Sequence, residues 1–268
     1  MNPMHKLLKK IPVRNKWKLA IKTVPLVTLI ILIKLLVHHF GYESLTLNSL
    51  FTAIISANIF LISFLISGVL VDYKESEKLP GEIASSLSSM SDEGFIIYQN
   101  KKSPESKAYL HHLITFHQAL IKWFHKEERT TELTKKITKF NDYFLAFESQ
   151  TTANFIVRIK QEQNNVRKCI TRIHTIRETA FLGTGYAIAE IITFILSIGL
   201  ILVKIDPFYE SIFFVSFVSF ILIYMIFFIK DLDNPFGYTK EDSLVEDVSL
   251  KPVYDSLKYL EEQVQALK

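Results

Sequence analysis

Four long apolar stretches divide this chain of 268 residues into two pairs, and a long polar segment separates the pairs. The stretches cover roughly residues 19–40, 47–71, 181–203 and 208–229. A helix needs about 20 apolar residues to cross a bilayer, and a soluble domain of this length has no room for four such uniformly apolar helices. The pattern therefore predicts an all-α membrane protein with four transmembrane helices in two hairpins.

The polar segment, about residues 81–180, keeps helical spacing of its apolar positions. Ser103, Pro104 and Glu105 predict a helix start, because serine caps, proline fits the first turn and glutamate complements the helix dipole. We expect this helix to reach about Arg129, a shorter one to follow, and a long one to run unbroken from about Ala153 into the third apolar stretch. The expected stripes are Leu110, Leu113, Phe116, Leu120 and Phe124, then Leu133, Ile137, Phe140, Phe144 and Phe147.

The tail, residues 230–268, begins with a helix stop. Pro235 disfavours helix at the residue before it, and Gly237 permits a turn, so the chain should fold back at this point. A last amphipathic helix is expected from Pro252, and its apolar stripe requires a partner helix. That stripe is Val253, Leu257, Leu260, Val264 and Leu267.

Basic residues set the expected orientation. The N-terminal arm, the polar segment and the tail are rich in Lys and Arg, whereas the hairpin turns, residues 41–45 and 204–207, carry only Lys204. The positive-inside rule places both termini and the polar segment in the cytoplasm. The helices of residues 81–180 are then a cytoplasmic bundle continuous with the membrane helices, and we expect one domain over residues 1–268.

Few ionisable residues interrupt the apolar stretches. Lys22 and Lys34 lie near the ends of the first stretch, where we expect them to reach the headgroups. Glu190 has two interpretations: it faces a water-filled cavity, or the hydrocarbon crossing begins at about Ile191 and leaves it at the interface.

Composition narrows the class further. The chain is 49% hydrophobic, and its mean hydropathy of +0.22 favours a membrane protein. With 8 glycines and 1 cysteine, collagen-like repeats, disulfide scaffolds and multi-cysteine zinc sites are excluded. The net charge of +4 is modest and its basic residues are not interleaved with aromatics, so no nucleic-acid partner is expected.

No motif proposes catalysis. His111, His112 and His117 lack the i, i+4 spacing of helical zinc ligands, and packed or solvated histidines are the better interpretation. Cys169 has no neighbouring base. Phosphate-binding, dinucleotide-binding and metalloprotease motifs are absent from the sequence. We expect no enzyme activity, no cofactor and no metal.

Two motifs resemble those of one family. The run from Leu70 to Gly81, with Asp72, Tyr73 and Leu79-Pro80, is similar to the stretch after the second transmembrane helix of bestrophins and their bacterial homologues. The run Asn234-Pro235-Phe236-Gly237, directly after the fourth stretch, resembles the signature that follows the last membrane helix of that family. The order of hairpin, cytoplasmic helices, hairpin and tail also matches.

The sequence departs from the family at two places. Val71 or its neighbour stands in place of an arginine, and Asp72 takes an aromatic position. The acidic run that builds the calcium clasp of animal bestrophins is missing, since Tyr238, Glu241 and Asp242 follow instead. The resemblance therefore gives no basis for calcium gating.

The resemblance implies a pentameric ion channel whose pore is lined by the second helix. Laying Leu79-Pro80 on the Leu-Pro of the family puts Ile55, Ile59 and Ser63 at its pore neck, and a shift of one residue gives Ser56, Phe60 and Phe64 instead. Either set has the i, i+4 spacing that points three side chains to one side of a helix. The sequence leaves both registers open.

The leading hypothesis is thus a passive, chloride-permeable homopentameric channel of bestrophin-like type in a bacterial inner membrane, in contact with lipid. Such a neck is a hydrophobic constriction. A rival hypothesis is a membrane-anchored scaffold or sensor that binds a partner through its last helix. A secondary transporter is the weakest hypothesis, because little beyond Glu190 is polar within the stretches.

Overall fold

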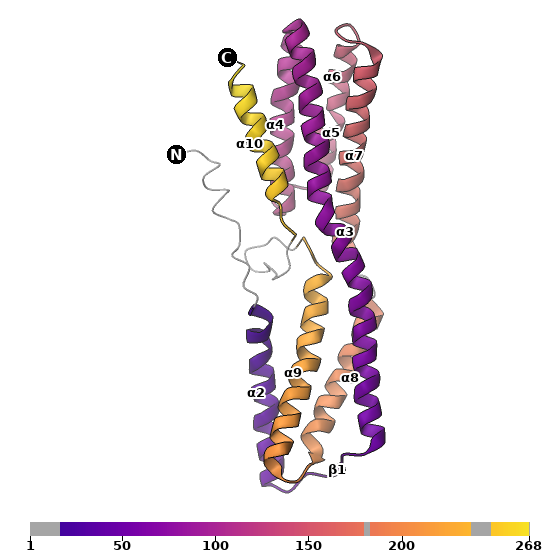
Figure 1. The fold of residues 1–268 in the computed structure, drawn as a ribbon, viewed down its shortest axis with the longest axis vertical. Helices are drawn as coiled ribbons and strands as arrows, with labels where there is room; N and C mark the ends of the chain where they lie inside the picture. Colours follow the sequence, from indigo (N-terminus) through magenta and orange to yellow (C-terminus); the bar gives the residue numbers. More distant parts are fainter. Residues whose placement is uncertain (1–16, 180–182, 237–247, 268) are drawn as a thin grey trace. The chain divides into compact units, whose positions relative to one another are not determined.

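The computed structural model describes residues 17–179, 183–236 and 248–267. These residues form helices and one pair of two-residue strands, in two compact units (Figure 1). The described part of the first unit is residues 17–73 and 183–235, and that of the second is 74–179, 236 and 248–267. The elements in order are α2 (Lys18–His39), β1 (Leu45–Thr46), α3 (Ser49–Lys101), α4 (Pro104–Phe124), α5 (Thr130–Thr138), α6 (Phe140–Phe147), α7 (Ala153–Glu178), α8 (Gly183–Leu202), β2 (Val203–Lys204), α9 (Phe208–Leu232) and α10 (Lys251–Gln265).

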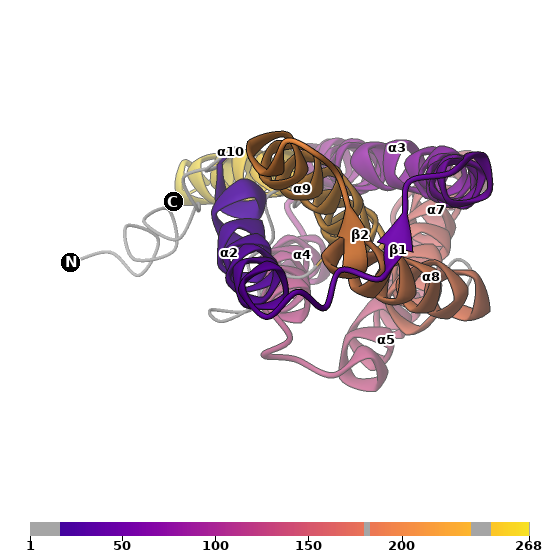
Figure 2. The ribbon, with the colours of Figure 1, turned by 90° about the horizontal axis from the view of Figure 1, so that it is seen from below.

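The first unit contains the four predicted apolar stretches, and each is helical. They correspond to α2, the first part of α3, α8 and α9, and within the described residues four helical segments are long and apolar enough to cross a membrane. The all-α fold class with four candidate membrane-spanning helices is confirmed. α8 and α9 pack against each other, whereas α2 packs mainly on α9 rather than on α3. β1 and β2, which the sequence did not indicate, pair in parallel with Leu45 opposite Val203 and join the turns of the two hairpins (Figure 2).

Lys34 does not reach a headgroup, so that expectation is wrong. Its side chain is fully buried, and its ammonium lies 2.6 Å from a carboxylate oxygen of Glu43, in the turn after α2. The same ammonium donates to the carbonyl of Ile201, in the last turn of α8, and to that of Val203, the first residue of β2. A helix leaves its last carbonyls without partners and carries partial negative charge there, so Lys34 caps α8 and ties it to α2.

The polar segment forms most of the second unit, and its predicted helix start is confirmed. Ser103 caps α4 by accepting a hydrogen bond from the Ser106 amide at 3.1 Å. The helix ends at Phe124, before the expected Arg129, and Lys126 has a positive φ of 59°. The next predicted helix is two helices, α5 and α6, with Lys139 between them.

Aromatic side chains fill the core of the second unit. Tyr109 on α4 makes edge contacts with Phe140 and Phe147 of α6, at centroid distances of 5.5 and 5.3 Å, and its hydroxyl donates to the Met90 carbonyl of α3 at 3.0 Å. The ring lies where a Cβ on Gly94 would be, only 2.5 Å away, so glycine lets α3 and α4 approach closely. Both predicted apolar stripes of this segment are buried.

α7 runs antiparallel to the second part of α3 and is joined to it by charged pairs. Arg158 pairs with Glu93 at 3.0 Å, and Arg172 binds both carboxylate oxygens of Glu75 at 2.9 and 2.6 Å. α7 ends at Glu178, and Thr179 is extended. The expectation of an unbroken helix from Ala153 into the third stretch is therefore wrong at Thr179, because the backbone leaves helical geometry there.

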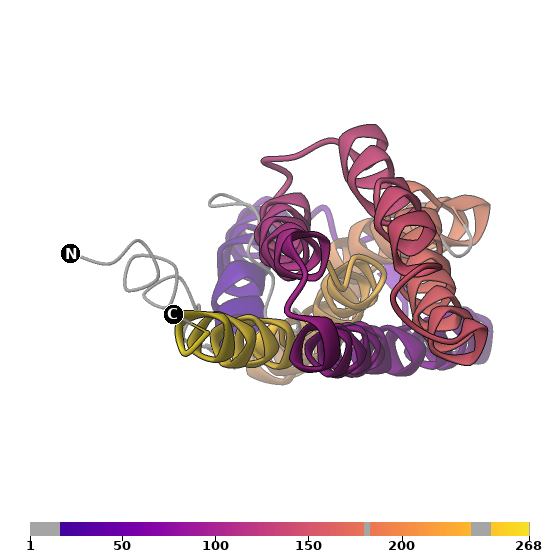
Figure 3. The ribbon, with the colours of Figure 1, turned by 90° about the horizontal axis from the view of Figure 1, so that it is seen from above.

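The tail forms the expected amphipathic helix, α10, with Pro252 in its first turn. Val253, Leu257, Leu260 and Val264 are buried, and α10, the yellow helix of Figure 3, packs against α4. The partner that its apolar stripe requires is thus a helix of the same chain.

Candidate functional site

One face of α3 packs against the rest of the first unit and fixes the rotation of this helix about its axis. Asn58 on that face is 1% exposed, and its amide donates to the Thr193 hydroxyl of α8 at 2.9 Å. Phe51 occupies the space in which Gly199 of α8 lacks a side chain, since a Cβ there would lie 2.6 Å from the ring. The same face continues through Ile62, Leu65 and Val69, which are fully buried.

The opposite face of α3 is exposed and largely apolar. Phe60 is 75% exposed, Phe64 63% and Val71 67%, and Ser67 between them is also exposed. The spacing of these positions, i, i+4, i+7 and i+11, keeps them on one side of the helix. We call Phe60, Phe64, Ser67 and Val71 the outward stripe. Among the residues that the structure describes, no element packs on this stripe.

The two predicted pore registers differ in how far the described part of the chain buries them. In the first, Ile55 is half-buried, Ile59 is 37% exposed and Ser63 is exposed. In the second, Ser56, Phe60 and Phe64 are all exposed, and the two rings belong to the outward stripe. The first set thus lies toward the side of α3, and the second lies opposite the packed face.

The exposed serine hydroxyls of this part of α3 donate hydrogen bonds to backbone carbonyls of the same helix. Ser56 donates to the Thr52 carbonyl at 3.0 Å, Ser63 to that of Ile59 at 2.8 Å, and Ser67 to that of Ser63 at 3.0 Å. A hydroxyl that donates in this way offers only its lone pairs to the surroundings. These serines therefore provide polarity on the exposed side of α3 without a free donor for an anion.

The Asn-Pro-Phe run stops α9 as predicted. α9 ends at Leu232, ahead of Asn234 and Pro235, and Phe236 is fully buried in the second unit. The ring of Phe236 lies 6.1 Å from that of Phe124 and 5.8 Å from the guanidinium of Arg177. The fourth residue of the run, Gly237, lies outside the described residues.

Arg177, near the end of α7, joins these aromatic groups. Its guanidinium donates to the Trp123 and Phe124 carbonyls at 3.2 and 2.9 Å, which caps the end of α4, and it lies 4.4 Å from the Trp123 ring centroid. Capping and a cation–π contact both favour a cation at this position. No local pattern indicates a role for this arginine, because its partners lie more than fifty residues away on the chain.

Glu190 is paired with a lysine. Its carboxylate lies 2.6 Å from the Lys230 ammonium of α9, and the two side chains are 41% and 54% exposed. The carboxylate is therefore balanced by a cation of the same unit, which agrees better with a position at the interface than with a bare charge inside the hydrocarbon.

The three histidines of α4 lie in different surroundings. His111 is exposed, His112 bonds the Lys136 carbonyl at 2.9 Å, and His117 is buried between the Leu113 carbonyl at 3.0 Å and the Ser256 hydroxyl at 3.4 Å. Among the described residues, no three His, Cys, Asp or Glu side chains are grouped to hold a metal ion.

Burial raises the pKa of Cys169 to about 11, helped by the nearby Glu82 carboxylate, so the thiol is a poor nucleophile at neutral pH.

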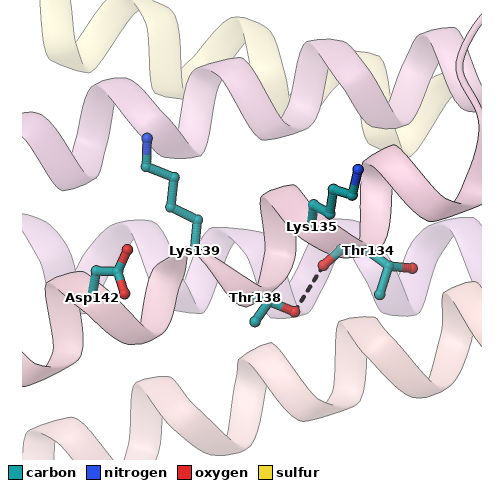
Figure 4. Close-up of a pocket in the computed structure, with 5 residues that line it drawn as sticks. All are labelled: Thr134, Lys135, Thr138, Lys139 and Asp142. Carbon is teal, nitrogen blue, oxygen red and sulfur yellow. Dashed lines mark hydrogen bonds between the residues drawn. The ribbon is translucent and has the colours of Figure 1, made fainter.

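A shallow hollow on α5 and α6 offers little to a ligand. It has a volume of about 340 Å³ and is lined by Thr134, Lys135, Thr138, Lys139 and Asp142 (Figure 4). Thr138 donates to the Thr134 carbonyl at 2.8 Å, and Lys135 pairs with Glu132 at 2.7 Å. Thr138 and Lys135 are thus already bound to other groups of the protein, and we assign the hollow no function.

Acid is expected to destabilise the second unit through His117. Burial lowers the pKa of His117 to about 4, below its ordinary value of 6.5. A buried neutral histidine contributes its full stability above pH 6.5 and loses it as the pH falls toward 4, because the unfolded chain then binds the proton more readily. Between pH 7.5 and 5 this linkage amounts to about 2 kcal/mol.

The free energy of unfolding of the full chain in detergent, measured at both pH values, checks this prediction. His117→Leu should remove that part of the pH dependence, and the matched change His111→Gln, at an exposed position of the same helix, should keep it. Equal pH dependence in the two variants would contradict the assignment to His117.

The comparisons with known proteins establish only the fold of this chain. No family model matches the sequence, and no curated protein matches it. Among solved structures, crystal structures of a bacterial bestrophin homologue from Klebsiella pneumoniae are similar. A variant of that protein superimposes with a TM-score of 0.75 at 12% sequence identity, covering 91% of this chain and 99% of that chain. A second structure, solved by zinc phasing, gives a TM-score of 0.75 at 11% identity, covering 92% and 98%. The chain therefore has a bestrophin-like fold, as the two sequence motifs predicted.

Proposed function

We propose that this chain, with its bestrophin-like fold, is one subunit of a homopentameric ion channel in a bacterial inner membrane, and that chloride is its main permeant ion. The observation that carries the proposal is that this fold extends over nearly the whole chain and includes α3, the helix with the unpartnered outward stripe. The membrane location is supported by the four apolar helices and by the similar membrane protein. Both termini are proposed to lie in the cytoplasm, because the basic residues flank the hairpins on that side.

The proposed pore neck is formed by the outward stripe. Five copies of α3 around one axis would point Phe60 and Phe64 at each other and bury these rings away from lipid. An apolar ring of this kind gates by dewetting. The face of α3 that packs on α8 cannot reach the axis, which favours the register of Ser56, Phe60 and Phe64 over that of Ile55, Ile59 and Ser63.

Phe60→Ala and Phe64→Ala are expected to raise the chloride conductance by about threefold or more, because a smaller side chain widens the constriction and lets water enter it. Single-channel recording after reconstitution measures the effect. Ile59→Ala, one residue away on the same helix, should change the conductance little. A large effect of Ile59→Ala with none at the two phenylalanines would move the neck to the other register.

The assembly and the permeation are tested in one preparation. The particle mass in detergent should equal five chains, and liposomes in a chloride gradient should shift toward the chloride potential. A monomer or dimer without conductance would overturn the proposal. The scaffold hypothesis has less support, since the apolar face of α10, through which a partner was expected to bind, packs on α4.

A further inference from the structure

We infer that Asn58 is the positioning residue of the proposed pore neck. Its hydrogen bond to Thr193 of α8 holds α3 in the rotation that turns Phe60 and Phe64 toward the axis of the proposed pentamer. The inference rests on the proposed channel function and deepens it by naming the contact that decides which side of α3 meets the permeant ion. Asn58 itself does not belong to the neck.

The directions of the side chains around α3 follow from the helical repeat. Successive residues of an α-helix lie about 100° apart around its axis, since one turn takes 3.6 residues. Phe60, the middle residue of its register, therefore points about 160° away from Asn58, whereas Ile59, the middle residue of the other register, points about 100° away. While Asn58 is held against α8, the side of α3 that is turned away from α8 carries Phe60.

Apolar packing alone does not select this rotation of α3. If the helix turned by one position, about 100°, Ala57 and Leu61 would take the places of Asn58 and Ile62. Both are apolar, so the turned face would still offer apolar groups to α8. Apolar contact between helices also has little hydrophobic driving force in lipid, because the lipid tails are equally apolar. What the turned helix would lose is the hydrogen bond to Thr193.

The bond between Asn58 and Thr193 is directional and lies away from water. The two residues are 1% and 6% exposed, and the Asn58 amide nitrogen donates to the Thr193 hydroxyl at 2.9 Å. A buried donor that loses its acceptor costs free energy, because neither lipid nor apolar side chains can replace the acceptor. The rotation of α3 that keeps this bond is therefore favoured over rotations that break it.

The other polar atom of the Asn58 side chain points to a role beyond added stability. Its carbonyl oxygen, Oδ1, is buried, and it has no hydrogen-bond partner among the residues that the structure describes. A buried polar group without a partner lowers the stability of a fold. In coiled coils, a single buried asparagine fixes the register of the helices at just such a cost in stability. Asn58 fits the same role in the alignment of α3 with α8.

The test records single channels of the full-length protein after reconstitution. Phe60→Ala and Ile59→Ala are each placed in the native chain and in Thr193→Val, which replaces the hydroxyl acceptor of Asn58 by a methyl group. In the native chain, Phe60→Ala should raise the conductance by about threefold or more, and Ile59→Ala should change it little. In Thr193→Val, the effect of Phe60→Ala should fall to about half or less, and that of Ile59→Ala should grow.

Two further variants show that the effect belongs to this contact. Asn58→Leu breaks the same bond from α3 and should shift both conductance effects in the same direction. Ser197→Ala is the matched control, because the Ser197 hydroxyl donates to the Thr193 carbonyl at 2.8 Å within α8 and its loss leaves the contact with α3 intact. A residue that only stabilised the fold would lower the unfolding temperature in Thr193→Val without changing which side chain controls the conductance.

The outcomes separate the two proposals. A native protein that conducts nothing would overturn the channel and this inference with it. A conducting protein in which the effect of Phe60→Ala persists in full in Thr193→Val would overturn the inference alone, as would a native chain whose conductance responds to Ile59→Ala and not to Phe60→Ala. Should Asn58→Leu fail to fold, Thr193→Val, which keeps the shape of its side chain, decides the question.

Discussion

Phe236→Ala is expected to lower the free energy of unfolding of the second unit by about 3–5 kcal/mol, as for other buried phenylalanines truncated to alanine. The ring is fully buried, and it contacts both Phe124 and the Arg177 guanidinium. Its loss would open a cavity beside a cation whose position depends on aromatic neighbours. The end of α4, which Arg177 caps, should loosen with it.

Urea unfolding in detergent, followed by tryptophan fluorescence, measures this effect well. The chain has 2 tryptophans, and Trp123, at 2% exposure, lies directly beneath Arg177, so it reports on this cluster. Tyr259→Ala provides the control, since Tyr259 is an aromatic residue of the same unit that is 55% exposed. It should change the stability by less than about 0.5 kcal/mol. Equal midpoints for the two variants would show that the Asn-Pro-Phe run contributes no packing.

Most helix starts and stops could be predicted, because each depends on a few adjacent residues. Ser103 with Pro104 marks the start of α4, and Pro235 ends α9. The break at Lys139 and the extended Thr179 could not be foreseen, because neither carries a Gly or Pro signal and tertiary packing decides the backbone there. The single domain expected over residues 1–268 stays a prediction.

The sequence predicted which helix forms the candidate site, α3, but not which side of that helix faces away from the rest of the unit. Spacing alone allows both the row through Ile59 and the row through Phe60, because each is apolar and each has helical period. What distinguishes them is contact with α8, through Asn58 and Phe51, more than a hundred residues away in sequence. Nothing in the local pattern of α3 shows which of its faces α8 will cover.

Lys34 shows the same limit at a single residue. A lysine near the end of an apolar stretch is normally expected to reach the headgroups. Here Glu43, nine positions later, and carbonyls at the end of α8 and the start of β2 provide partners within the protein. Burying a charged group costs much free energy unless the group has partners. The Lys34 ammonium has three, the Glu43 carboxylate and the carbonyls of Ile201 and Val203. The resulting link between α2 and α8 holds the two hairpins together and so helps to set the position of α3.

Lys34→Met is therefore expected to destabilise the first unit by about 3–5 kcal/mol, the range for breaking a buried ion pair by removing one partner. Among the described residues, Glu43, whose side chain is 7% exposed, would keep only the His38 ring, at 2.9 Å, as a hydrogen-bond partner, and the carbonyl of Ile201 would lose its donor. Thermal unfolding in detergent measures the loss. Lys204→Met is the control at the same end of the unit, since Lys204 forms an exposed pair with Asp206 at 3.5 Å, and it should cost less than about 1 kcal/mol.

Acid should reproduce part of the Lys34→Met effect. Burial acts to raise the pKa of Glu43, but the hydrogen bonds from Lys34 and His38 outweigh it, and the pKa lies below the ordinary value of 4.5. A carboxyl with a lowered pKa stabilises the fold above its unfolded pKa, and this contribution is lost as the pH falls below 4.5 through the lower folded value. In Lys34→Met the Glu43 carboxylate loses its main partner, so this pH dependence should weaken. Adding Glu43→Gln should restore part of the lost stability, because no unpaired carboxylate then remains buried. A double variant no more stable than Lys34→Met would show that the capped carbonyls of α8, and not the ion pair, carry the interaction.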